Sequence, residues 1–143
     1  MKKTFGIILV IVIVILVLFI GWYNENLSEK RVVSNYNSEY EVYIDEDIVS
    51  GVDLTTIINK AMDNNETYSI EKDENEHYIN DDNYYTEIYI MLEEDGDSYA
   101  MEAFYEVGID EFTSLYGEAE FECTSIEYHE NGRISKMNFE IIN

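Results

Sequence analysis

The first feature of the chain is an apolar run from Phe5 to Tyr23 that contains no charge and no polar side chain before Trp22 and Tyr23. An α-helix rises about 1.5 Å per residue, so roughly 20 apolar residues cross a bilayer core of about 30 Å. The run therefore predicts one transmembrane helix. We assign residues 1–23 to a short cytoplasmic stub and this helix.

The residues that flank the run predict its orientation. Lys2 and Lys3 precede it, and the first acidic residue is Glu25. Positive charge stays on the cytoplasmic side, which places the amino terminus inside and the rest of the chain outside the cell membrane. Trp22 and Tyr23 suit the membrane–water boundary. A cleavable signal peptide has an apolar core of about 7–15 residues followed by small residues, so we predict an uncleaved anchor with these four residues as its flanks.

After the run, apolar residues are no longer consecutive but recur at regular intervals. Residues 24–47 carry apolar side chains at near-helical spacing and then become more extended, which predicts a helical stalk or linker. From residue 48 we predict an acidic α+β domain. Its first helix starts at Ser50, a helix-capping residue with Asp53 in the capping-box position. The apolar positions that follow share one helix face: Leu54, Ile57, Ile58, Ala61 and Met62.

Alternating patterns further along predict strands. Residues 67–71 and 86–92 alternate, and Asp95-Gly96 is a turn signal before a return strand at 98–101. Residues 72–83 form a charged loop. Helical spacing then runs from Met101 to Tyr116, with Gly108 as the point where this helix divides in two.

The last pattern is a β-hairpin around Asn131-Gly132, the preferred pair for a two-residue type I′ turn. Residues 118–130 and 133–142 supply its strands. The expected cross-strand pairs are Glu130 with Arg133, Glu127 with Lys136, Ile126 with Met137, and Thr124 with Phe139.

One face of this hairpin is apolar and should meet the helices: Tyr128, Ile126, Met137, Phe139 and Ile141. Strict alternation places Phe121 and Cys123 on the other face, and a bulge near residues 124–125 would return both to the apolar face. Together these elements predict the α+β class, with an antiparallel sheet of about four to five strands packed by two helices.

Charge narrows the class of partner. The 120 residues after Tyr23 hold 31 acidic and six basic side chains, a formal charge of −25. Their apolar content is high enough to bury a core, which excludes a disordered chain. The acidic balance argues against nucleic acid and anionic lipid surfaces. It favours solubility of an exposed face, and it permits a cationic partner or weak cation binding by the acidic loops.

No constellation of catalytic, cofactor-binding or metal-ligating residues emerges. His77 and His129 lack the spacing of a metal pair and are expected on the surface, and Cys123 is expected as a small apolar side chain in a strand. None of the acidic clusters matches the spacing of a calcium loop; in the first of them, Val49 occupies the third ligand position after Asp45 and Asp47. We therefore predict a non-catalytic, envelope-associated interaction module with no cofactor.

Residues 50–66, 99–108 and 121–140 resemble, in order and spacing, an uncharacterised family of small membrane-anchored proteins of clostridia and related Firmicutes. The resemblance covers most of residues 36–140. It implies a bacterial protein with a single membrane span, and it implies no activity or site.

A looser resemblance, to type IV pilin-like subunits, supplies the alternative. It rests on the basic leader Lys2-Lys3-Thr4-Phe5-Gly6, the apolar helix and the acidic α+β head. The family's Glu at the fifth position after that Gly is Ile11 here. Because that Glu pairs with a neighbouring amino terminus in the family's filaments, its replacement puts filament assembly in doubt.

Overall fold

The structure, a computed structural model, describes residues 2–44, 46–93 and 96–142, and for residues 2–5, 106 and 107 it describes the backbone alone. The chain divides into two compact units, Met1–Asn35 and Tyr36–Asn143. The second unit starts earlier than the predicted boundary at residue 48. The reason is that Tyr40 is 1% exposed and Tyr36 is partly buried within this unit.

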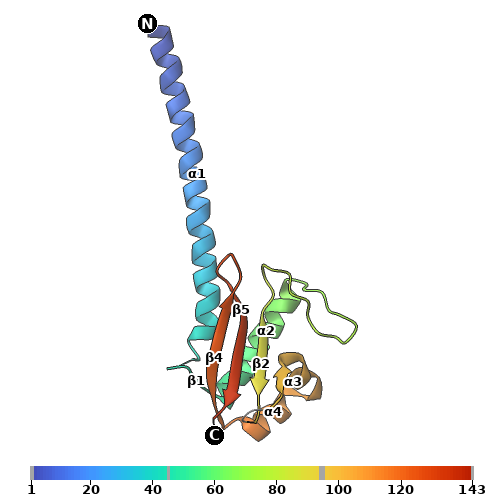
Figure 1. Ribbon diagram of the computed structural model, residues 1–143. Coiled ribbons are helices and arrows are strands. Elements are labelled where there is room, and N and C mark those ends of the chain that lie inside the picture. Colours follow the sequence, from blue (N-terminus) through green and yellow to red (C-terminus); the bar gives the residue numbers. More distant parts are fainter. Residues whose placement is uncertain (1, 45, 94–95, 143) are drawn as a thin grey trace. The chain divides into compact units, whose positions relative to one another are not determined.

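The elements confirm the predicted α+β class. In chain order they are α1 (Lys2–Glu41), β1 (Ile48–Ser50), α2 (Gly51–Thr67), β2 (Glu87–Met91), β3 (Ser98–Ala100), α3 (Met101–Val107), α4 (Ile109–Tyr116), β4 (Glu120–Tyr128) and β5 (Ile134–Ile141), and Figure 1 labels each of them except β3. The predicted division at Gly108 is confirmed, since this glycine has φ 112° between α3 and α4.

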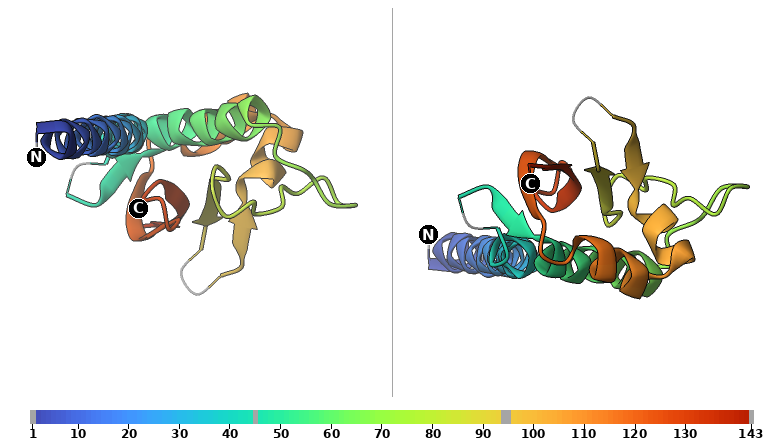
Figure 2. Two further views of the ribbon diagram at one scale, coloured as in Figure 1. Left: turned by 90° about the horizontal axis from the view of Figure 1, so that it is seen from above. Right: turned by 90° about the horizontal axis from the view of Figure 1, so that it is seen from below.

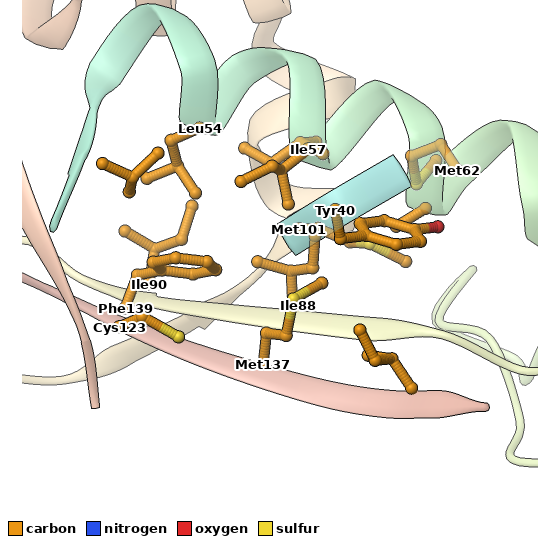
Figure 3. Packing of buried hydrophobic residues seen from close by; sticks show 14 of the residues in the cluster. Tyr40, Leu54, Ile57, Met62, Ile88, Ile90, Met101, Cys123, Met137 and Phe139 are labelled. Atoms are coloured by element: carbon orange, nitrogen blue, oxygen red, sulfur yellow. The ribbon is translucent and has the colours of Figure 1, made fainter. Parts of the chain in front are cut away.

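The predicted start of α2 is also confirmed. The Ser50 hydroxyl accepts a hydrogen bond from the Asp53 amide at 3.1 Å and donates one to the Asp53 carboxylate at 2.8 Å. The predicted apolar face is buried throughout. Figure 3 shows Leu54, Ile57 and Met62 directed from α2 toward the sheet residues.

The sheet has five strands in the order β1-β4-β5-β2-β3, and it is mixed. The β2–β5 pair is parallel, so the prediction of a purely antiparallel sheet is wrong at this pair. Turn signals specify only neighbours in sequence, whereas β2 and β5 are distant in sequence and meet through burial of Ile88, Ile90, Met137 and Phe139. Helices α2, α3 and α4 lie on one face of the sheet (Figure 2).

One local prediction of a strand is wrong, and one short strand escapes prediction. Residues 67–71 form no strand, because α2 continues to Thr67 and the Tyr68 amide donates to the Asn64 carbonyl as a helix cap. Ser69 then turns the chain with φ 52°. Conversely, the segment after the stalk contains β1, which pairs with β4 and which its short length concealed.

The hairpin register is confirmed at its centre, where Glu127 pairs with Lys136 and Ile126 with Met137. The predicted bulge is also confirmed. Thr124 is the extra residue between the Cys123–Phe139 and Ser125–Asn138 pairs, and Phe121 and Cys123 are both buried. The bulge makes the predicted Thr124–Phe139 pair wrong.

The turn differs from the predicted type I′ geometry. The His129 amide donates to the Arg133 carbonyl, and the Gly132 amide donates to the His129 carbonyl. Gly132 has φ 85°, so three residues form the loop with Gly132 in the left-handed position. The predicted Glu130–Arg133 pair is therefore wrong, and Tyr128, predicted to face the core, is 52% exposed.

Candidate functional site

The apolar helix carries the residues predicted to flank a membrane. From Gly6 to Glu41 it has a mean hydropathy of 3.1 in its most apolar window, and none of that window is buried. Its large side chains from Ile7 to Ile20 are between 46% and 68% exposed. Trp22 is 60% and Tyr23 53% exposed, and the Trp22 ring lies 6.0 Å from that of Phe19. The side chains of Lys2 and Lys3 lie outside the described residues.

In the second unit, a groove of about 310 Å³ opens between the β2–β3 end of the sheet and helices α3 and α4. We call it the apolar groove. Its walls include Leu92, Tyr99, Ala103, Phe104, Gly108, Phe112, Leu115 and Tyr116, and among the described side chains that line it Glu111 alone is charged. Leu115 is 69% exposed and Tyr99 46% exposed, so apolar surface remains in contact with solvent.

Aromatic contacts hold the walls of the apolar groove in place. The Phe112 ring lies 5.0 Å from Phe104 and 5.3 Å from Tyr116. On its inner side, Phe112 lies 6.2 Å from Phe121, which is fully buried in the sheet. The aromatic floor of the groove is therefore packed against the core of the second unit.

A second cavity of about 470 Å³ adjoins the first and shares Leu92, Tyr99 and Tyr116 with it. Its other walls are Glu93, Gly96 and Asp97, so we call it the carboxylate pocket. Apolar walls and carboxylates thus meet along one edge. This arrangement suits a ligand with an apolar part next to a positive charge.

A buried arginine forms a separate cluster. Arg133 is 4% exposed, and its guanidinium carbon lies 3.6 Å from the Tyr36 ring centre, 5.2 Å from Tyr68 and 5.3 Å from Tyr84. We call this cluster the Arg133 cage. One terminal nitrogen donates to the Asn64 side-chain oxygen at 3.0 Å, while Nε has no hydrogen-bond partner within the described part of the chain.

Tyrosine hydroxyls continue the network of the Arg133 cage. The Tyr36 hydroxyl hydrogen-bonds with Thr86 and with Tyr40, at 3.1 Å for the second. Burial raises the pKa of both tyrosines above the usual value near 10. The Asn37 side-chain Nδ2 donates to the Gly132 carbonyl at 2.9 Å, and its side-chain Oδ1 accepts from the Ile134 backbone amide at 3.0 Å. The cluster therefore ties the end of α1 to the hairpin turn, which is a structural role.

The histidines differ from each other. The expectation of a surface position is wrong for His129, which is 8% exposed with Nε2 at 2.6 Å from the Tyr85 carbonyl. His77 is exposed. Cys123 is buried as predicted, and burial, with Asp47 nearby, raises the pKa of its thiol to about 11. Such a thiol is protonated and sheltered near neutral pH.

Several acidic residues organise loops. The Asp73 carboxylate accepts from the His77 and Asn75 amides, which lower its pKa. The net pKa of Asp81 is lowered. Burial by itself would raise it, but the backbone amides of residues 83–85 donate hydrogen bonds to the carboxylate and outweigh burial. Among the described residues, no three His, Cys, Asp or Glu side chains gather as a metal site. In the clusters 45–47 and 93–97, Asp45, Glu94 and Asp95 lie outside the described residues.

No known protein family matches the chain, and neither a curated protein nor a solved structure does. The resemblances to clostridial membrane-anchored proteins and to pilin-like subunits stay predictions.

Proposed function

We propose that the chain is a single-pass membrane protein whose acidic domain lies outside the cell membrane and serves as a non-catalytic interaction module. One observation carries the proposal: a helix whose large apolar side chains, from Ile7 to Ile20, are about half exposed or more. A soluble monomer rarely exposes so much contiguous apolar surface, whereas a bilayer covers it on every side.

The interaction role is supported by the second unit. Its apolar groove leaves Leu115 and Tyr99 open to solvent above a base of packed aromatic rings. Concave, mostly apolar surfaces with a few polar groups are typical of binding sites. The formal charge after Tyr23 favours partners that are basic.

Fractionation of cells that express the full-length protein tests the anchor. We expect the protein in the membrane pellet after washing with alkaline carbonate, and in the soluble phase only after detergent is added. Recovery of the protein as a monomer in the detergent-free supernatant would contradict the proposal.

Thiol labelling tests the orientation. A membrane-impermeant maleimide should label Glu74→Cys in intact cells, because residue 74 is exposed in the domain. It should label Thr4→Cys only after lysis, because residue 4 precedes the span. The wild-type protein is the matched control, since its one thiol, Cys123, is buried and should react slowly. The reverse labelling pattern would place the domain in the cytoplasm.

A pilin-like filament subunit is the second candidate. The observation that favours it is that α1 is one continuous helix. Its first part is the apolar run, and its last residues, from Tyr36 on, belong to the folded unit. Mass spectrometry of the mature protein separates the two candidates. An amino terminus at Ile7 would support processing of a leader and the pilin-like role, whereas intact Lys2-Lys3 would support the uncleaved anchor.

A further inference from the structure

The apolar groove and the carboxylate pocket form one composite surface with uneven charge. Glu111 lines the first cavity, and Glu93 and Asp97 line the second. The three walls that the cavities share are Leu92, Tyr99 and Tyr116. A bound side chain on the apolar side would therefore lie within a short distance of these carboxylates.

The positive charges of the folded unit are all engaged elsewhere. Residues 36–143 contain only four Lys and Arg residues, and none of them lines either cavity. They make the following contacts: Lys60 with Glu39, Lys72 with Glu76 and the Tyr78 ring, Lys136 with the Tyr89 ring, and Arg133 with its cage. Within the described part of the chain, the carboxylates at the composite surface thus form no salt bridge.

We propose that this composite surface binds a basic peptide segment of a protein partner, one that presents an aromatic or aliphatic side chain directly beside a Lys or Arg. The apolar side chain occupies the apolar groove against Phe104, Phe112 and Leu115. The adjacent cation lies at Glu93 and Asp97. The inference deepens the proposed function, on which it rests.

Charge complementarity selects this occupant over the other candidates. An anionic lipid surface and a second copy of the acidic chain would both bring negative charge to a rim that is already negative. A neutral apolar ligand would fill the groove but would leave the carboxylates unpaired. A basic segment with an apolar anchor satisfies both parts, and it joins burial of apolar area with steering by opposite charge.

The test uses the full-length protein in nanodiscs of phosphatidylcholine, a lipid without net charge. The probe is the peptide Lys-Phe-Lys-Leu-Lys-Phe-Lys, and binding is measured by titration calorimetry. Two matched peptides replace either the Lys residues by Glu or the apolar residues by Ser. We expect binding of the first peptide alone, with an affinity that falls as salt is added.

Variants of the protein locate the binding surface. Leu115→Gln should weaken binding by about fivefold or more, because it removes an apolar wall. Its control, Val42→Gln, changes a side chain that is 73% exposed and lines neither cavity. Glu93→Gln with Asp97→Asn should weaken binding about threefold to tenfold and flatten the salt dependence. The control pair Glu74→Gln with Asp82→Asn removes the same charge from exposed positions outside both cavities.

Three results would overturn the inference. The first is equal binding of the Ser-containing peptide, which would mean attraction by net charge alone. The second is equal weakening by the control pair. The third is self-association that Leu115→Gln abolishes while the peptide does not bind, which would make a second copy the occupant. Incorporation into nanodiscs is scored separately by co-elution, so failure of the anchor is distinguished from failure of the groove.

Discussion

Arg133 places a positive charge in the interior of the folded unit, and no carboxylate forms a salt bridge with it among the described residues. Aromatic faces and one amide oxygen stabilise it instead. This arrangement uses the planar guanidinium, which stacks on rings and donates in a fixed fork. An ammonium group cannot reproduce both contacts.

We therefore expect Arg133→Lys to lower the free energy of unfolding by about 2 kcal/mol. Arg133→Met should cost less, about 1 kcal/mol, because it removes the buried charge together with its contacts. Urea denaturation followed by near-ultraviolet circular dichroism measures both. Lys136→Met is the control, since Lys136 lies over the Tyr89 ring but is only partly buried. Equal stability of the Lys and Met variants would contradict the stacking argument.

Tyr78 gives a prediction about alkaline pH. Burial, with Glu66 and Glu102 adding repulsion, raises the pKa of its hydroxyl to about 12, compared with about 10 in an unfolded chain. The folded state thus holds this proton more tightly, so the stability it contributes is complete below pH 10 and is lost as pH rises toward 12.

The hydroxyl of Tyr78 also has no hydrogen-bond partner among the described residues. Tyr78→Phe should therefore be neutral or slightly stabilising at pH 7. Above pH about 10, the variant should lose stability less steeply with pH than the wild-type protein does. Urea midpoints measured across this range give the comparison. A slope equal to that of the wild type would show that Tyr78 does not carry the alkaline transition.

At the scale of elements, the contact between the start of α2 and the end of α4 allows no side chain. A Cβ at Gly51 would lie 1.8 Å from the Tyr116 carbonyl oxygen. The Gly51 amide donates to the Ala119 carbonyl at 2.9 Å, and the hydroxyls of Thr55 and Thr113 lie 2.9 Å apart. These contacts fix α4, and with it one wall of the apolar groove.

Gly51→Ala should accordingly lower the free energy of unfolding by about 2 kcal/mol or more, because the helices must separate. It should also weaken binding at the apolar groove, since Phe112 and Leu115 lie on α4. Thermal unfolding and peptide titration measure the two effects. Gly21→Ala is the control, because a Cβ at Gly21 would have no neighbouring atom within 4 Å. A Gly51→Ala protein with an unchanged midpoint would exclude the close approach.

At the scale of the whole molecule, the boundary of the folded unit decides which fragment is stable. Residues 36–143 form one compact unit that includes the last turns of α1. Tyr40 is fully enclosed, and Asn37 accepts from and donates to the hairpin backbone. A domain that starts at residue 48 would lack these contacts.

We expect a fragment of residues 36–143 to fold cooperatively. A fragment of residues 48–143 should lose about 3 to 5 kcal/mol of stability, the cost of removing a large buried aromatic side chain. Urea denaturation of the two fragments measures the difference. Equal stability would place the boundary at residue 48 and would leave the Arg133 cage without a structural role.

Much of this molecule follows from local patterns in the sequence. The apolar run, the Ser50 cap with its buried helix face, the break at Gly108 and the centre of the hairpin register all depend on neighbours within a few residues. Even the bulge at Thr124 could be predicted, because Phe121 and Cys123 must return to the buried face. Such features depend on residues that are close together in the sequence, so local sequence patterns are enough to predict them.

The tertiary structure decided what depends on distant partners. Three features depend on contacts between segments far apart in the chain. These are the parallel pairing of β2 with β5, the pairing of β1 with β4, and the contact of Arg133 with Tyr36. The three-residue turn that includes Gly132 belongs with them, since it places Arg133 in its cage. The apolar groove is of the same kind, because its walls come from the β2–β3 end of the sheet and from α3 and α4. Burial selects these pairings only once the whole core assembles, and no local pattern contains that information.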